Sequence, residues 1–246
     1  MPERVHVVLV ATTHPGNIGA SARAMKTMGL SSLRLVRPSG FPGAEASARA
    51  AGAGDLLAAA KVHETLAEAV RDCSLVLGSS ARQRSIPWPE YTPREAAARV
   101  AAAAAAGENV ALVFGRERSG LSNEELALCN GMIRIPANPA FQSLNLAAAV
   151  QILAYELRLA LLDGTEPPPE EAPLASAEDM EQFYDHLARC LEDIGFYDPE
   201  HPRRLMQRLR RLFNRAQLDQ NEYNILRGIL AAAQDCARGR KEKDGS

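Results

Sequence analysis

The sequence predicts an α/β fold in which helices flank a parallel sheet, followed by a small all-helical C-terminal extension. Over the first two-thirds of the 246 residues, short β-branched runs alternate with helical patterns, which is typical of parallel strands joined by crossover helices. Residues 163–175 (DGTEPPPEEAPLA) are rich in Pro and Glu and lack periodicity, which indicates a linker. Three helical patterns follow it. The predicted divisions are therefore a domain at 1–162, the linker, and the extension at 176–246.

Short apolar runs predict the strands of the sheet. The first, Val5–Ala11 (VHVVLVA), has the unbroken apolar character of a strand buried on both faces. Four more are predicted at Ser32–Val36, Leu75–Gly78, Val110–Phe114 and Met132–Ile135. Only weaker elements are indicated between residues 44 and 71.

Capping residues predict several helix boundaries. Gly29, after a helical pattern at Ile18–Met28, suits the left-handed position that ends a helix. Thr or Ser followed three residues later by Glu is typical of a capping box, and this pattern places helix starts at Thr65, Thr92 and Ser122.

The last long helix of the first domain is predicted at Leu144–Leu162. Its apolar residues recur at the spacing of one helix face, which indicates a face buried in the core or in a subunit interface. The extension is predicted to hold helices at Ser176–Ile194, Pro202–Asn214 and Asp219–Arg238, and the residues after these are expected to fray.

Composition excludes several classes of protein. Hydrophobic residues make up 46% and charged residues 24%, as in soluble globular proteins. No apolar run approaches the roughly 18 residues that a membrane-spanning helix needs. The first residues lack the basic start and apolar stretch of a signal peptide, so we expect a cytoplasmic protein. Four scattered cysteines without CxxC spacing indicate neither a metal site nor a disulfide framework.

The net charge of −2 conceals a division of charge along the chain. Residues 1–162 carry 16 basic and 13 acidic side chains, residues 163–200 carry 1 and 12, and residues 201–246 carry 11 and 5. A basic tail after an acidic hinge is a candidate surface for binding a polyanion. The alternative is a solvated basic helix face that pairs with the acidic hinge.

Polar loops follow the predicted strands at the edge where α/β sheets bind ligands. After the first strand, Arg23 lies in the second turn of a helix, where a guanidinium can bind phosphate or remain merely solvated. Neither GxGxxG nor GxxxxGK[ST] is present, which disfavours a dinucleotide-dependent oxidoreductase and a P-loop enzyme.

Other loops carry polar groups at matching positions. GRERSG (115–120) places Arg116, Glu117 and Arg118 between two glycines that allow a tight turn. Residues 79–82 (SSAR) can contact a carboxylate or ribose, and Asn145 either holds a ligand or caps a helix. Trp88, between two prolines, either packs or stacks on a base.

Three segments together resemble the motifs of the SpoU branch of the SPOUT methyltransferases. They are GNIGASARAMKTMG (Gly16–Gly29), LVFGRERSGLSNEEL (Leu112–Leu126) and IPANPAFQSLNLAAAVQILAYE (Ile135–Glu156). Within that branch the chain is most similar to the TrmJ-type tRNA 2'-O-methyltransferases. Residues 205–230 of this chain resemble the C-terminal extension of those enzymes. The resemblance covers nearly the whole chain, and the order and spacing of the three motifs make it specific.

The resemblance implies more than the residues alone do. It implies a trefoil knot in the C-terminal part of the sheet domain, S-adenosylmethionine bound in the knot, no metal, and a homodimer whose active site is shared across the interface. By position, the cofactor pocket would be formed by Ser79, Ser80, Ala81, Gly115, Ile135, Gln142, Ser143 and Leu144.

The implied reaction is methyl transfer to the ribose 2'-hydroxyl of cytidine or uridine at the first nucleotide of the tRNA anticodon loop. We expect Arg23 of the second subunit to bind the adjacent phosphate and stabilise charge on the oxygen, Ser143 and Asn145 to orient the hydroxyl, and Glu117 to organise the pocket. The expected RNA contacts are Arg23, Arg82, Arg84, Arg116, Arg204, Arg208, Arg210, Arg211 and Arg215. The alternatives are a ribosomal RNA methyltransferase of the same branch and a non-catalytic RNA-binding protein.

Overall fold

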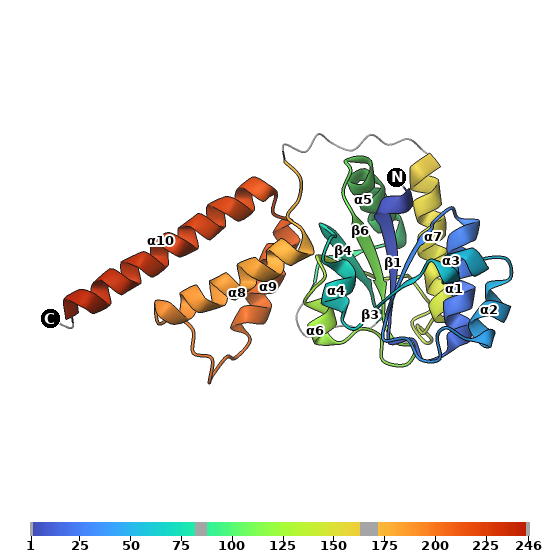
Figure 1. The fold of residues 1–246 in the computed structure, drawn as a ribbon, viewed down its shortest axis with the longest axis horizontal. Coiled ribbons are helices and arrows are strands. Elements are labelled where there is room, and N and C mark those ends of the chain that lie inside the picture. Colours follow the sequence, from blue (N-terminus) through green and yellow to red (C-terminus); the bar gives the residue numbers. More distant parts are fainter. Residues whose placement is uncertain (1, 82–87, 163–171, 245–246) are drawn as a thin grey trace.

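A seven-stranded parallel sheet forms the centre of the computed structural model, which describes residues 2–81, 88–162 and 172–244. The strand order is β3-β2-β1-β6-β4-β7-β5, and all neighbours run parallel. Helices cover both faces, and three further helices lie to one side of the sheet (Figure 1). The predicted fold class is confirmed.

All five predicted strands are present, and two short ones were missed. The strands are β1 Val5–Val10, β2 Ser32–Val36, β3 Lys61–His63, β4 Leu75–Ser79, β5 Glu90–Tyr91, β6 Val110–Phe114 and β7 Gly131–Ile133. β3 and β5 escaped prediction because runs of three and two residues are too short to show a period.

The predicted helix starts are confirmed for the most part. The helices are α1 Pro15–Thr27, α2 Ala44–Ala50, α3 Gly54–Ala58, α4 Leu66–Val70, α5 Pro93–Ala105, α6 Asn123–Leu126, α7 Leu146–Leu162, α8 Ala177–Asp193, α9 Leu205–Ala216 and α10 Gln220–Asp244, after a 3-10 turn at Pro2–Arg4. Thr92 and Ser122 form complete capping boxes, whereas Thr65 forms only the half in which its side chain accepts a backbone N–H. Gly29 has the predicted left-handed backbone, with φ +80°. The predicted end of the last helix at Arg238 is wrong, because Arg, Lys and Glu favour helix and carry α10 further.

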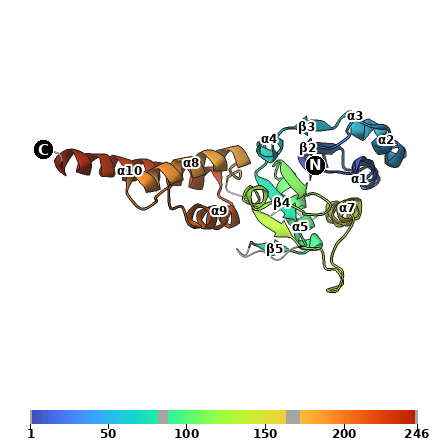
Figure 2. The same cartoon turned by 90° about the horizontal axis from the view of Figure 1, so that it is seen from below.

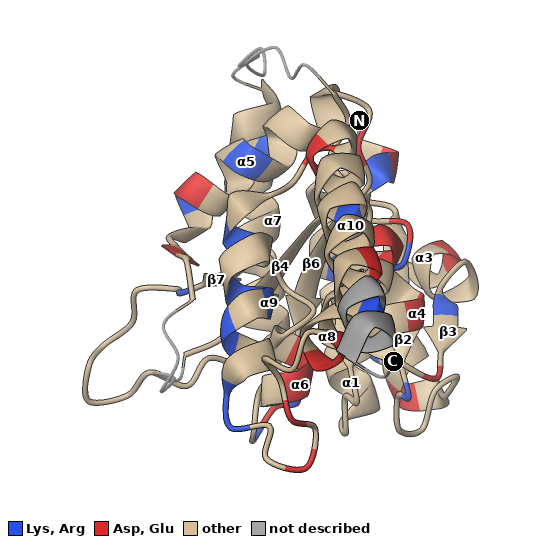
Figure 3. Ribbon diagram, turned by 90° about the vertical axis from the view of Figure 1, so that its left-hand side faces the viewer, with Lys and Arg blue, Asp and Glu red and all other residues tan. Residues whose placement is uncertain are grey.

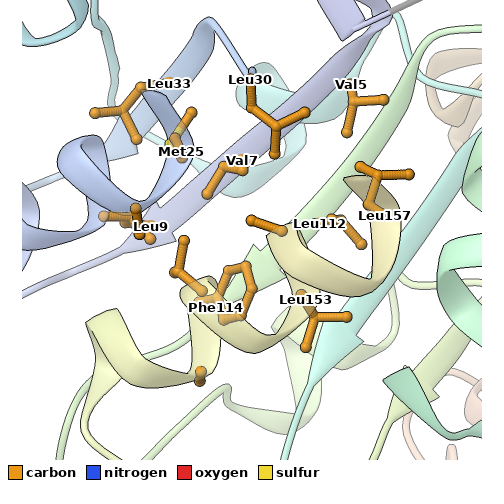
Figure 4. Packing of buried hydrophobic residues seen from close by; sticks show 14 of the residues in the cluster. Val5, Val7, Leu9, Met25, Leu30, Leu33, Leu112, Phe114, Leu153 and Leu157 are labelled. Atoms are coloured by element: carbon orange, nitrogen blue, oxygen red, sulfur yellow. The ribbon is translucent and has the colours of Figure 1, made fainter. Parts of the chain in front are cut away.

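Residues of β1 divide between two cores, one on each face of the sheet. Val5, Val7 and Leu9 pack with α1 and α7 on one face (Figure 4), while Val8 and Val10 pack against α4 on the other. This alternation follows from the two-residue period of a strand. On the first face α7 packs against both α1 and α5 and buries its predicted apolar stripe, which belongs to the core.

The order of β7 in the sheet bears on the predicted knot. β7 is last in the sequence, yet it lies between β4 and β5. A C-terminal segment that enters between earlier strands is compatible with the threading that the resemblance implies. The knot itself stays a prediction.

The extension forms its own small core. α8, α9 and α10 pack around Phe183 and Tyr184, and the Phe183 ring meets Phe213 edge-on at 4.8 Å. The backbone N–H of Ala175 donates to the Leu218 carbonyl (2.8 Å), so this residue of the predicted linker already belongs to the extension. α10 runs away from the sheet domain (Figure 2). None of the described helices is long and apolar enough to cross a membrane.

Candidate active site

A cavity of about 750 Å³ lies at the carboxyl ends of three neighbouring strands, β6, β4 and β7. Its size falls within the range of about 300–1,000 Å³ that is typical of small-molecule sites. The loops after these strands and the start of α7 form its walls. The predicted cofactor residues all line it: Ser79, Ser80, Ala81, Gly115, Ile135, Gln142, Ser143 and Leu144.

The loop after β6 turns back tightly at the cavity. Arg116 and Gly120 exchange two backbone hydrogen bonds (3.2 and 2.9 Å). A Cβ atom added at Gly115 would lie 2.2 Å from the backbone carbon of Gly120, so only glycine fits there. Gly120 itself has φ +68°, a conformation that favours glycine. This turn brings Glu117 and Arg118 into the cavity lining.

Glu117 fastens the turn to the start of α1. Its carboxylate accepts hydrogen bonds from Thr13 N (3.1 Å) and Oγ1 (2.9 Å), from His14 N (3.2 Å) and from Asn17 Nδ2 (2.9 Å). Burial alone would raise the pKa of Glu117, but the hydrogen bonds from Asn17 and Thr13 outweigh it and lower the pKa to about 2. Glu117 is therefore an anion at neutral pH, placed at the positive end of α1.

Asn17 links this carboxylate to the start of α7. Asn145 donates from Nδ2 to Asn17 Oδ1 (3.0 Å), and its own Oδ1 accepts the backbone N–H of Ala147 (2.9 Å). Asn145 thus caps α7, which is one of the two roles predicted for it. The hydrogen bonds from Glu117 through Asn17 to Asn145 join the three segments that resemble the SpoU motifs. Sequence reasoning gave Asn17 no role, because an amide in the first turn of a helix is as typical of capping as of a site.

Two arginines of the cavity lining are paired with carboxylates. Arg116 forms a two-pronged pair with Glu125 (2.9 and 2.9 Å), which raises the pKa of the Arg116 guanidinium, and Arg134 pairs with Glu90 (2.8 and 3.0 Å). The structure thus places Arg116, an expected RNA contact, in the cavity wall. The lining also contains residues to which the sequence gave no role: Phe114, Arg134, Leu146 and Ala149.

Arg23 lies on α1, exposed, and does not line the cavity of its own chain. Its guanidinium makes no hydrogen bond or ion pair with the rest of the described chain. Arg82 and Arg84 lie outside the described residues. Trp88 packs, since its indole N–H donates to the Leu126 carbonyl (3.0 Å) and its ring contacts the core around α4.

The arginines of α9 divide between two faces. Arg208, Arg211 and Arg215 recur at the spacing of one helix face, and Arg204, the N-cap residue just before α9, continues that spacing. We call these four residues the arginine row. Figure 3 shows blue basic positions recurring along the ribbon of α9. No member of the row has an ion pair among the residues that the structure describes.

Arg210 points the other way, into the extension. Its guanidinium pairs with Glu181 (2.5 and 2.8 Å) and lies 4.3 Å from the centre of the Tyr184 ring. It therefore stands apart from the row with which it was grouped as an RNA contact. Arg210 therefore matches the alternative expectation, in which basic side chains of the tail pair with the acidic segment 163–200, because Glu181 belongs to that segment.

Comparison with protein families matches both parts of the chain. Residues 4–155 match the SpoU rRNA Methylase family, and residues 178–244 match the C-terminal domain of the tRNA methyltransferase TrmJ. The chain belongs to the SpoU methylase family. The cavity at the ends of β6, β4 and β7 is thus the candidate active site of a SpoU-family protein. Within the described residues, no group of three His, Cys, Asp or Glu side chains could hold a metal ion there or elsewhere.

Relatives in the SpoU family match nearly the full length. The tRNA (cytidine/uridine/adenosine-2'-O-)-methyltransferase TrmJ of Pseudomonas aeruginosa (strain UCBPP-PA14) is 53% identical over 249 residues, covering 97% of each chain. The tRNA (cytidine/uridine-2'-O-)-methyltransferase TrmJ of Escherichia coli K12 is 49% identical over 245 residues, covering 98% of this chain and 99% of that one. The crystal structure of TrmJ from Z. mobilis ZM4 is 35% identical, with a TM-score of 0.79 over 92% of this chain and 97% of that one.

Proposed function

We propose that this protein transfers a methyl group from S-adenosylmethionine to the ribose 2'-hydroxyl of cytidine or uridine in tRNA, at the first nucleotide of the anticodon loop. The observation that carries the proposal is the single cavity lined by all eight expected cofactor residues. The names of the full-length relatives support the reaction, and the match of the extension to a tRNA methyltransferase domain favours tRNA over ribosomal RNA.

The side chains of the cavity fit this cofactor chemically. Phe114, Ile135 and Leu144 offer an apolar wall, and Ser79 and Ser80 offer hydroxyl groups. When bound, S-adenosylmethionine supplies a methyl group that is already activated on a positively charged sulfonium. The anionic carboxylate of Glu117 in the same lining favours a positive charge, and hydrogen bonds from the Thr13 backbone and the Asn17 side chain keep that carboxylate in place.

Alignment is the main demand of such a displacement, because no nucleophilic side chain is needed. Ser143 lines the cavity and is assigned to orienting the hydroxyl. Asn145 does not line the cavity itself but lies between two residues that do, Leu144 and Leu146. It commits its oxygen and one N–H to the fold, and we assign its second N–H to the hydroxyl. With a pKa of about 2, Glu117 is a poor proton acceptor at neutral pH, so it is assigned to organising the pocket and not to general-base catalysis. The hydroxyl proton is released to solvent water, directly or by way of the adjacent phosphate, as the oxygen attacks the methyl group.

We assign Arg23 to the cavity of a second copy of the chain. Its guanidinium is exposed, unpaired within the described chain and absent from its own cavity lining, so a role at the reacting oxygen requires a partner subunit. There it would bind the adjacent phosphate and stabilise the charge that develops on the oxygen. Mixed dimers of Arg23→Ala and Gly115→Ala chains should regain activity that neither variant has alone. No regain would place the whole site within one chain.

The arginine row supplies the general affinity for tRNA in this proposal. Phosphate contacts add affinity without reading sequence, which suits a surface that holds the tRNA body. A solved structure whose subject is the 2'-OH methylation of C/U34 on tRNA is 30% identical to this chain, with a TM-score of 0.53. The match covers 67% of this chain and 100% of that one. About a third of this chain therefore has no counterpart in that structure. A tRNA substrate places the protein in the cytoplasm.

Mass spectrometry of tRNA nucleosides tests the proposal directly. tRNA from cells that lack this protein should lose 2'-O-methylcytidine or 2'-O-methyluridine at the first anticodon-loop position, and the methylated nucleoside should return with the gene. Unchanged tRNA together with a lost methyl group in ribosomal RNA would favour the alternative substrate.

A further inference from the structure

Among the described residues, hydrogen bonds fasten the extension to the sheet domain at three places. At the start of α8, the backbone N–H of Ala177 donates to the carbonyl of Cys73 (2.6 Å). On α5, the guanidinium of Arg99 donates to the side chain of Gln217. The third attachment is buried and centres on Asn214 of α9, on the face that points away from the arginine row.

Asn214 uses nearly all of its hydrogen-bonding capacity at this attachment. Asn214 is only 5% exposed to solvent. Its Nδ2 donates to the carbonyls of Ala127 (3.0 Å) and Cys129 (3.1 Å) in the sheet domain, and its Oδ1 accepts the Tyr184 hydroxyl (2.5 Å) from α8. Because a buried amide that loses its partners is costly, these bonds hold the two parts in one arrangement.

Asn214 binds a segment of the sheet domain that lies between two parts of the cavity wall. Residues 127–130 follow α6 and precede β7. On the α6 side, Glu125 holds Arg116 in the wall, and on the other side β7 leads directly into Arg134 and Ile135, which line the cavity. Movement of α9 relative to residues 127–130 would therefore reach the cavity from both directions.

The same helix carries the arginine row on another face, where Arg208 and Arg215 are exposed and Arg211 is half-buried. Asn214 lies between Arg211 and Arg215 in the sequence but on the inner face, with Arg210 one turn before it. From Arg204 to Arg215 the row advances by 11 residues, or about 16 Å at about 1.5 Å per residue. Of the three attachments, this buried amide is the one within the helix that carries the row, so it helps to set the position of the row with respect to the cavity.

We propose that Asn214 is a positioning residue that sets the reach between tRNA held by the arginine row and the cavity. The inference rests on the proposed function and adds a determinant of which nucleotide is methylated. Its physical basis is that small misplacements of a reacting group cost far more in rate than in affinity.

The test compares Asn214→Asp with Asn224→Asp. Asn214→Asp keeps the shape and the acceptor for Tyr184 but loses both donors to the sheet domain. Asn224 is exposed on α10, so its replacement makes the same charge change without touching the attachment. For Asn214→Asp alone, the single-turnover rate at saturating tRNA should fall about tenfold or more, while the Kd values for tRNA and S-adenosylmethionine stay within about twofold. Mapping of the methylated nucleotides should also show product at neighbouring positions.

Three results would overturn the inference: a rate within about twofold of the unaltered protein, a tRNA Kd that weakens in step with the rate, or an equal loss in Asn224→Asp. If Asn214→Asp lowers the melting temperature enough to unfold the chain, Asn214→Ala, which adds no buried charge, takes its place in the same measurements. Failure of the unaltered protein to methylate any tRNA would instead refute the proposed function.

Discussion

The Glu117 carboxylate should stabilise the native state measurably at neutral pH. Its pKa is about 2 in the folded protein, against an ordinary value of 4.5. A shift of this size corresponds to about 3.4 kcal/mol, at about 1.36 kcal/mol per unit. Because the side chain is partly exposed, solvent screening reduces this to about 2 kcal/mol. Glu117→Gln keeps the shape and removes the charge, so we expect the free energy of unfolding at pH 7 to fall by about that amount.

Urea unfolding at two pH values tests this reasoning. A lowered carboxyl pKa contributes its full stability above the ordinary value of 4.5, and the contribution is lost as the pH falls through about 2. The difference between the unaltered protein and Glu117→Gln should therefore drop to roughly half at about pH 3. Glu64→Gln, at an exposed carboxylate, is the matched control and should differ little. A Glu117→Gln effect below about 0.5 kcal/mol at pH 7, or one that is the same at both pH values, would refute the account.

Four further predictions follow from the site and the core. Arg23→Ala should lower kcat by about a hundredfold or more with an unchanged Kd for S-adenosylmethionine, and full turnover would contradict the assigned role. Gly115→Ala should abolish cofactor binding in calorimetry, since its Cβ has no room, whereas Gly54→Ala, with nothing within 4 Å, should bind normally. Arg208→Gln should reduce the slope of log K for tRNA against log salt by about one, and an unaltered slope would remove it from the RNA surface. Burial and a neighbouring guanidinium lower the pKa of His6 from 6.5 to about 4, so stability should decline by up to about 3 kcal/mol as the pH falls from 6.5 to 4, a decline that His6→Gln should flatten in the same unfolding assay.

Most of the sheet domain could be predicted because its signals are local. Buried parallel strands are continuous apolar runs, as at Val110–Phe114, and the capping boxes at Thr92 and Ser122 fixed two helix starts. The order of the strands carries no such local signal. β7 inserts between β4 and β5 through pairing over long sequence distances, and only the resemblance to a family pointed to it.

The residues of the candidate cofactor cavity came from the family resemblance, and their convergence fits the order of the strands, whereas the partners of its charged side chains could not be predicted. Carboxyl ends of neighbouring parallel strands meet at one edge, so the loops at Ser79, Gly115 and Ile135 converge. Whether an arginine is free or paired depends on side chains far along the chain. Arg210 and its neighbours look alike in sequence, and only the packing of α9 on α8 turns Arg210 inward to Glu181.

The central claim is that the 2'-hydroxyl of the first anticodon-loop nucleotide is methylated, and removing that one hydroxyl from the tRNA tests it most directly. Two tRNA transcripts are compared, identical except that one carries a 2'-deoxy nucleotide at the first anticodon-loop position. With labelled S-adenosylmethionine, the unaltered transcript should take up label and the deoxy transcript should stay at background. Equal labelling of both would contradict methylation of that 2'-hydroxyl, whatever the cavity binds.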